Sequence, residues 1–103
     1  MNDLQKLVRA FCKKHGLESS PEHHLLDAVS ELGEVAKVLL EMTDYGRKPM
    51  AHSDEINVEL GDLLYSLITV ANAFDVDLEG ALHLSLEKYE KRLQKGSPGS
   101  ENE

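Results

Sequence analysis

The segment Ile56–Phe74 is the most apolar part of the chain, yet it carries two carboxylates, Glu59 and Asp62, three residues apart. On an α-helix, residues at this spacing lie about 60° apart on one face, so both carboxylates share a polar stripe. The spacing recurs in a second apolar stretch, at Glu31 and Glu34. Two apolar helices, each with one acidic stripe, therefore constrain the fold most strongly.

Four segments carry helical periodicity or helix-end signals, and none shows the strict alternation typical of a strand. Ser20 before Pro21, and Ser53 before an acidic first turn, are N-cap signals, while Gly16 is a helix stop. Helices as apolar as the second and third are expected to be mostly buried. The sequence predicts an all-α fold of four helices, at about residues 3–15, 20–42, 53–74 and 77–93.

The length of 103 residues suits a single domain. We expect this domain to span residues 1–94, and the polar tail of residues 95–103, "KGSPGSENE", to be disordered. A monomer of this size buries a modest fraction of its surface, so association of copies would add stability.

The formal net charge is −8, and the acidic side chains concentrate in the centre of the chain. Residues 51–75 hold five carboxylates and no Lys or Arg. Such a surface repels a nucleic-acid polymer and attracts divalent cations. No uncharged apolar run reaches the length of a membrane span, so we expect no membrane partner.

Cys12 is the single cysteine, which excludes an internal disulfide and fits a reducing cytoplasm, the predicted compartment. The N-terminal residues lack the apolar core of a signal peptide. We expect Cys12 to be a packed small residue. The five histidines show no zinc-ligand spacing, and no P-loop or nucleophile-elbow motif occurs.

The two acidic pairs allow two interpretations. They lie on exposed strips, as acidic side chains commonly do, or the two stripes face each other and four carboxylates converge. Like charges at this spacing destabilise a helix, and no basic residue close in sequence offsets Glu59 and Asp62. Convergence would require a cation, and Mg²⁺ takes oxygen ligands while leaving positions for phosphate. We favour a metal site at Glu31, Glu34, Glu59 and Asp62.

The stretches "SELGEV" and "VELGDLLYSLITVANAFDVDLEGALHLSLEKYEKR" resemble the MazG-type all-α nucleoside triphosphate pyrophosphohydrolases over roughly residues 22–93. The family signature is E-x-x-E on one helix and E-x-x-D on the next. The resemblance implies Mg²⁺-dependent cleavage, with Mn²⁺ as a substitute, of a nucleoside triphosphate to monophosphate and pyrophosphate. It also implies a homodimer or homotetramer, and a role for Glu31 or Glu34 in taking a proton from the attacking water.

The outer phosphates need positive charge, which the matched ending "EKYEKR" supplies. We expect Lys88 and Arg92, one turn apart on a helix, to bind phosphate. The alternative is that both are solvated residues near a helix C-terminus. Lys37 is a weaker candidate, and Asn72 is either a nucleotide contact or a polar residue of the core.

The chain departs from the family pattern in two places. Ser30 precedes Glu31 where relatives often have two adjacent glutamates, and Asp27 is a possible substitute ligand. Relatives often use a Trp of the first helix for base stacking, whereas this chain has none. Phe11 offers an aromatic ring there, but we expect it in the core. These departures affect metal count and base preference.

Three other functions stay open at this point. Phosphoribosyl-ATP is an alternative substrate within the same superfamily. Two alternatives belong to other functional classes. One is a catalytically silent helical oligomerisation or regulatory module, and the other is a bundle that binds cations without turnover. The intact carboxylate set argues against the silent module, since four uncompensated carboxylates would serve no purpose in it.

Overall fold

The computed structural model describes residues 2–96, which form four α-helices and no strand. The predicted all-α fold is confirmed, and the four predicted segments agree with the observed helices to within one or two residues. Most of the predicted tail, residues 97–103, lies outside the described part of the chain. The helices are α1 (Asp3–His15), α2 (Pro21–Met42), α3 (Asp54–Ala73) and α4 (Leu78–Gln94).

Side-chain caps fix where three of the helices begin. The side-chain oxygens of Asn2, Ser20 and Ser53 accept hydrogen bonds from first-turn backbone N–H groups, at 2.8, 3.2 and 3.1 Å respectively. Each bond satisfies a donor that the first helical turn leaves without a partner. Gly16 follows α1 with a φ of 64°, a left-handed conformation that glycine adopts without a steric penalty.

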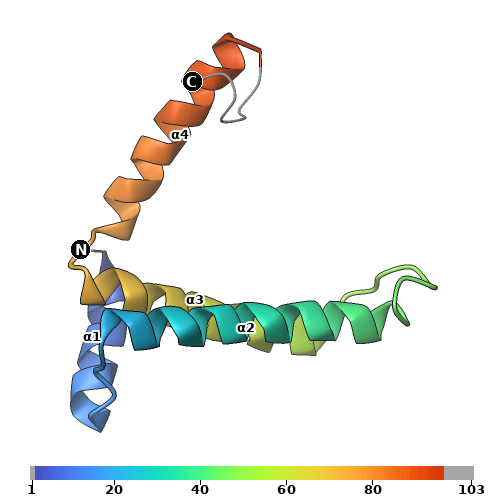
Figure 1. Ribbon diagram of the computed structural model, residues 1–103, viewed down its shortest axis with the longest axis horizontal. Helices are drawn as coiled ribbons and strands as arrows, with labels where there is room; N and C mark the ends of the chain where they lie inside the picture. Colours follow the sequence, from blue (N-terminus) through green and yellow to red (C-terminus); the bar gives the residue numbers. More distant parts are fainter. Residues whose placement is uncertain (1, 97–103) are drawn as a thin grey trace.

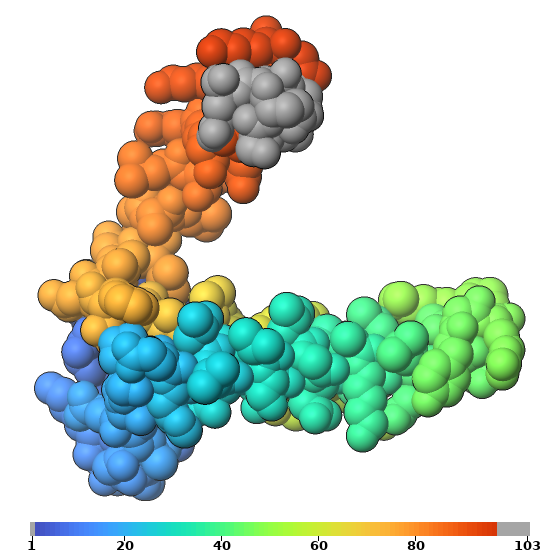
Figure 2. Space-filling model, viewed as in Figure 1, coloured from blue at the N-terminus to red at the C-terminus, as the bar shows by residue number. Residues whose placement is uncertain are grey.

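The helices α2 and α3 form an antiparallel pair, and α1 packs against one end of α3 (Figure 1). From that same end α4 departs at an open angle, with at most marginal contact to the other helices (Figures 1 and 2). None of the described helices is both long and apolar enough to cross a membrane. The α2–α3 pair is therefore the frame that positions the acidic stripes.

The core of a single copy is small. Its buried apolar side chains are Cys12, Ala28, Val35, Val38, Ile68 and Ala71. In contrast, α3 leaves Leu60, Leu64 and Leu67 exposed. The expectation that α2 and α3 are mostly buried is therefore wrong for one copy. α2 and α3 pack mainly against each other, and exposed apolar side chains continue around both helices beyond that contact.

Gln5 of α1 is fully buried and joins α1 to the segment between α3 and α4. Its Nε2 donates to Asn72 Oδ1 at 3.1 Å and to the backbone oxygen of Val76 at 2.7 Å. Its Oε1 accepts from the N–H of Leu78 at 2.9 Å. Asn72 Nδ2 in turn donates to the backbone oxygen of Gln5 at 3.1 Å. These four bonds, the Gln5 junction, fix the start of α4 relative to α1 and α3.

Candidate metal centre

Carboxylates from two helices meet on the α2–α3 pair. Glu31 of α2, and Glu59 and Asp62 of α3, each place one carboxylate oxygen within 4.8 Å of the others. Glu31 and Glu59 are half-buried, and Asp62 is exposed. The two acidic stripes meet because the antiparallel α2–α3 hairpin places Glu31 beside the first half of α3. We call these three residues the carboxylate triad.

Glu34, the fourth carboxylate of the expected set, is exposed and lies outside the triad. Its charge nevertheless acts on the triad. Partial burial raises the pKa of Glu59 above its usual value, and the negative charges of Asp62, Glu34 and Glu31 raise it further. A cation at the triad would relieve this repulsion.

The donor set fits a hard divalent cation. The triad offers only oxygen atoms, which suit Mg²⁺ and Mn²⁺ and leave coordination positions for water or phosphate. Within residues 2–96, the ion pairs lie elsewhere and leave the triad uncompensated. They join Arg9 to Asp75, His23 to Asp27, and Arg47 to Asp44.

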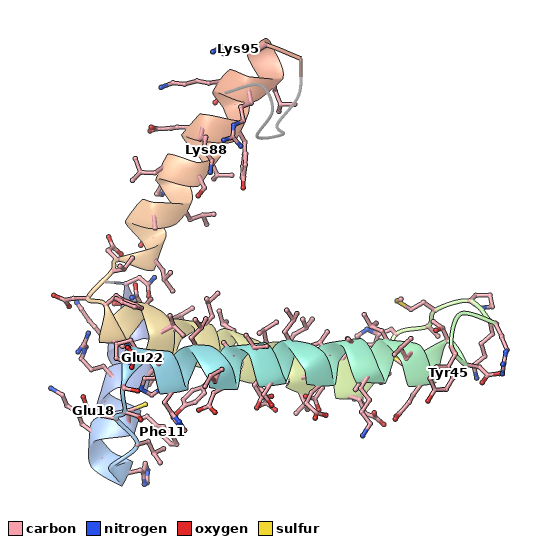
Figure 3. All side chains as sticks on the ribbon, viewed as in Figure 1. Phe11, Glu18, Glu22, Tyr45, Lys88 and Lys95 are labelled. Atoms are coloured by element: carbon pink, nitrogen blue, oxygen red, sulfur yellow. The ribbon has the colours of Figure 1, made fainter. Side chains whose placement is uncertain are left out.

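The cations expected to bind phosphate lie on a different part of the fold. Lys88 and Arg92 belong to α4, which stands apart from α2 and α3 (Figure 3). Lys88 is exposed, whereas Arg92 is buried. Their cationic groups lie 4.9 and 5.9 Å from the ring centroid of Tyr89. Within one copy, the fold does not bring these two side chains to the triad.

Two weaker candidates lie on α2. Asp27, one turn before Glu31, is outside the triad and pairs with His23 at 3.4 Å. Lys37, one turn after Glu34, is exposed. Both are on the helix that supplies Glu31, but neither forms part of the convergent group.

Asn72 lies ten residues beyond Asp62 on α3, about 15 Å along the helix axis. Its side-chain amide both donates to and accepts from Gln5, and its backbone oxygen accepts from Arg9 at 3.2 Å. In this structure Asn72 therefore joins α3 to α1, and sequence separation hid that pairing.

Sequence reasoning did not single out a small cavity of about 60 Å³ between α1, the start of α2 and α3. Beside it, Cys12 Sγ lies 3.3 Å from the Tyr65 hydroxyl. This hydrogen bond, together with burial, raises the pKa of Tyr65 to about 12. No local motif marks the cavity, because distant segments line it. The lining residues are Arg9, Cys12, Glu18, Ser19, His24, Thr69, Asn72 and Ala73.

Two expectations for α1 have different outcomes. Cys12 is buried, as a packed small residue should be. Phe11 was expected in the core but is 47% exposed, and its ring meets that of Tyr65 edge-on at 6.1 Å between centroids. The prediction for Phe11 is wrong because α1 packs mainly against the end of α3, which leaves about half of this side chain exposed.

A family model for the MazG nucleotide pyrophosphohydrolase domain matches residues 19–97. The chain belongs to the MazG nucleotide pyrophosphohydrolase family. The match includes α2, α3 and α4, and with them the triad, Glu34 and Lys88. It confirms the resemblance drawn from the acidic motifs and places the chain broadly among the nucleotide pyrophosphohydrolases.

The chain is also similar to a bacterial protein. The uncharacterized protein YpjD of Bacillus subtilis (strain 168) is 32% identical over 97 residues, covering 89% of this chain and 85% of that protein. No solved structure matches. Family membership therefore rests on the domain model.

Proposed function

We propose that this chain is a Mg²⁺-dependent nucleoside triphosphate pyrophosphohydrolase. It cleaves ribo- or deoxyribonucleoside triphosphates to the monophosphate and pyrophosphate, and serves nucleotide-pool housekeeping in the cytoplasm. The observation that carries the proposal is the convergence of Glu31, Glu59 and Asp62 from two helices within a MazG domain.

The triad, with Glu34 beside it, holds the metal in this proposal. Bound Mg²⁺, or Mn²⁺ in its place, supplies charge neutralisation for the triphosphate and acidifies bound water. The carboxylates of Glu31, Glu59 and Asp62 would hold the cation, and the triphosphate would be positioned by its attraction to that cation. Without a cation, the same carboxylates repel a triphosphate, so the apo protein should bind nucleotide poorly.

Glu34 is our choice for the proton acceptor, with Glu31 as the alternative. Glu34 is exposed and outside the triad, yet close enough to Glu59 to raise its pKa. A carboxylate at that position takes the proton from water as the water oxygen bonds to phosphorus. The bond between the α- and β-phosphates breaks, and its electron pair leaves with pyrophosphate.

Lys88 and Arg92 are assigned to the outer phosphates, and the functional form is a homodimer or homotetramer. Both side chains belong to α4, which lies within the matched MazG domain. Charge-assisted bonds from such side chains would stabilise the negative charge that builds on the departing pyrophosphate. Asn72 stays a candidate nucleotide contact, and Lys37 is a weaker candidate for the phosphates.

A product assay tests the proposal. The protein is incubated with Mg²⁺ and each nucleoside triphosphate in turn, dUTP included, and the products are resolved by ion-exchange chromatography. Monophosphate with pyrophosphate is the expected pair. Nucleoside diphosphate with orthophosphate would overturn the assignment of the cleaved bond.

Controls separate the site from contaminating activity. Turnover should vanish with excess EDTA and in Glu59→Gln, and should survive in Glu18→Gln, an exposed glutamate outside the triad. If no nucleoside triphosphate is cleaved, phosphoribosyl-ATP is tested next. Cleavage of that compound alone would replace the proposed substrate.

A further inference from the structure

The cavity between α1, α2 and α3 lies on the same faces of α2 and α3 as the carboxylate triad. His24 precedes Glu31 by seven residues on α2, and Thr69 follows Asp62 by seven residues on α3. Seven residues fall about 20° short of two full turns, so each pair shares one side of its helix and is about 10.5 Å apart along the axis. Because His24 and Thr69 both line the cavity, it continues the two acidic stripes toward α1.

His24 brings an unused hydrogen-bond donor to this cavity. Its side chain is 8% exposed, and its Nε2 accepts from the backbone N–H of Ser19 at 3.1 Å. A neutral imidazole that accepts at one nitrogen carries its proton on the other, so Nδ1 is a donor. Among residues 2–96, no group accepts this proton. A buried donor without a partner costs free energy, which a ligand with an acceptor at this place recovers.

Thr69 offers a hydrogen-bond acceptor in the same cavity. This residue is 5% exposed, and its hydroxyl donates to the backbone oxygen of Ser66 at 2.6 Å. Since the hydroxyl proton is engaged, the oxygen keeps lone pairs that can accept a bond from a ligand. The buried wall of the cavity therefore offers both a donor and an acceptor, which is what the polar edge of a nucleobase requires.

The charge and the size of the cavity favour an uncharged ligand with a single ring. Arg9 and Glu18 carry opposite charges beside the cavity, and Arg9 also pairs with Asp75 at 3.6 Å, so no excess positive charge attracts a phosphate. The volume of about 60 Å³ holds about four to six waters. A pyrimidine ring takes roughly that space, whereas the second ring of a purine does not fit unless a wall of the cavity moves.

We propose that this cavity receives the base of a pyrimidine nucleotide whose phosphates lie at the carboxylate triad, and that His24 selects this base by donating from Nδ1 to the carbonyl oxygen O2. Cytosine and uracil share that oxygen, so one donor serves both bases. Thr69 accepts from the amino hydrogen of cytosine or the ring N–H of uracil. The inference rests on the proposed function for the position of the phosphates, and it names the substrate class of the same site.

Turnover of four nucleoside triphosphates tests the selection. With Mg²⁺ present, kcat/KM for CTP and UTP should exceed that for ATP and GTP by about 10-fold or more. His24→Leu removes the donor and should raise KM for CTP and UTP by about 5-fold, while kcat and the purine values stay nearly unchanged. His23→Leu, at the exposed neighbouring position, is the matched control and should leave every KM as it is.

Binding of the monophosphate products tests the cavity without turnover. CMP, UMP, AMP and GMP are titrated into ¹⁵N-labelled protein with Mg²⁺, and the ring nitrogens of His24 are followed by NMR, with the signals assigned through His24→Leu. CMP and UMP should shift the Nδ1 signal, whereas AMP and GMP should leave it in place. Thr69→Val keeps the shape of the side chain without its hydroxyl, and it should weaken the binding of CMP and UMP by about 5-fold.

The outcomes distinguish this inference from the proposed function. Equal kcat/KM for purines and pyrimidines, or pyrimidine KM values that neither His24→Leu nor Thr69→Val changes, overturn the selection while the proposed function stands. A His24 signal that no monophosphate moves overturns the pocket, whatever the protein cleaves. If no triphosphate is cleaved but CMP and UMP still shift His24, the proposed function fails and the pyrimidine pocket is upheld.

Discussion

Glu31 of α2 and Glu59 of α3 bring carboxylate oxygens within 4.8 Å of each other, although the two residues are far apart in the sequence. Both are half-buried, and the carboxylates around Glu59 all raise its pKa. Because these like charges repel each other, a substitution or a bound cation that neutralises one of them should stabilise the folded chain. The first two predictions follow from that balance.

Asp62→Asn should keep the helical fold, raise the metal-free melting temperature, and reduce turnover by on the order of 10²-fold or more. The gain in stability comes from removing one of the like charges that act on Glu59. Circular dichroism and the product assay measure the two effects. Asp54→Asn, in the first turn of α3, is the matched control and should leave turnover unchanged. Loss of the helical signal in Asp62→Asn would show that the residue serves structure.

Mg²⁺ and Mn²⁺ should raise the melting temperature of the wild type, because they bind the folded triad better than the unfolded chain. At ten times the dissociation constant, the gain is about 1.4 kcal/mol. The shift should be lost in Glu31→Gln and reversed by EDTA. An equal shift in the variant would mean that the ions act elsewhere.

The stability of the metal-free protein should depend on pH through Glu59. Its pKa is raised in the folded state, so the folded state binds this proton more tightly than the unfolded chain does. The penalty of the charged group is present at neutral pH and falls as the pH drops through the folded pKa, which lies above the ordinary value of a glutamate. The melting-temperature advantage of Glu59→Gln should therefore shrink toward acid pH. An advantage that stays constant would contradict the shift.

Tyr65 should stay protonated well into the alkaline range. Its pKa is about 12, and the hydrogen bond with Cys12 is the main cause. The stability from the neutral phenol is present below pH 10 and is lost as the pH rises toward 12. Absorbance at alkaline pH, read as the difference between wild type and Tyr65→Phe, reports this titration. In Cys12→Ala the transition should move to lower pH, and an unmoved transition would exclude the bond as its cause.

Gln5→Leu should lower the free energy of unfolding by about 2–4 kcal/mol, because it leaves buried partners of the Gln5 junction unpaired. Urea titration at one fixed protein concentration measures the loss. Lys6→Leu, on the exposed side of α1, is the control and should cost little. A loss of stability equal to that of the control would show that the hydrogen bonds of Gln5 do not hold the start of α4 in place.

The helices and the convergence of the two acidic stripes could be predicted from the sequence. Cap residues such as Ser20 and Ser53 act within one turn, so a local pattern reports them reliably. The spacing of Glu59 and Asp62 likewise fixes a shared face on α3. An antiparallel hairpin is the simplest way to bring Glu31 beside them.

The contacts between helices could not be predicted from the sequence. Gln5 and Asn72 are 67 residues apart, and either side chain alone reads as an ordinary polar residue. The periodicity of Leu82 and Leu86 predicts an apolar face but does not say which surface covers it. The exposure of Phe11 and of α3 was missed for the same reason, since burial depends on neighbours that the local pattern does not specify.

The Gln5 junction has a consequence for how such a chain can change. Its central residue lies in α1, ahead of residues 19–97 that match the MazG domain, whereas the triad lies within them. The direction of α4 is thus set by a segment that carries none of the proposed chemistry. Substitutions in that first helix could redirect how copies assemble while every carboxylate keeps its place.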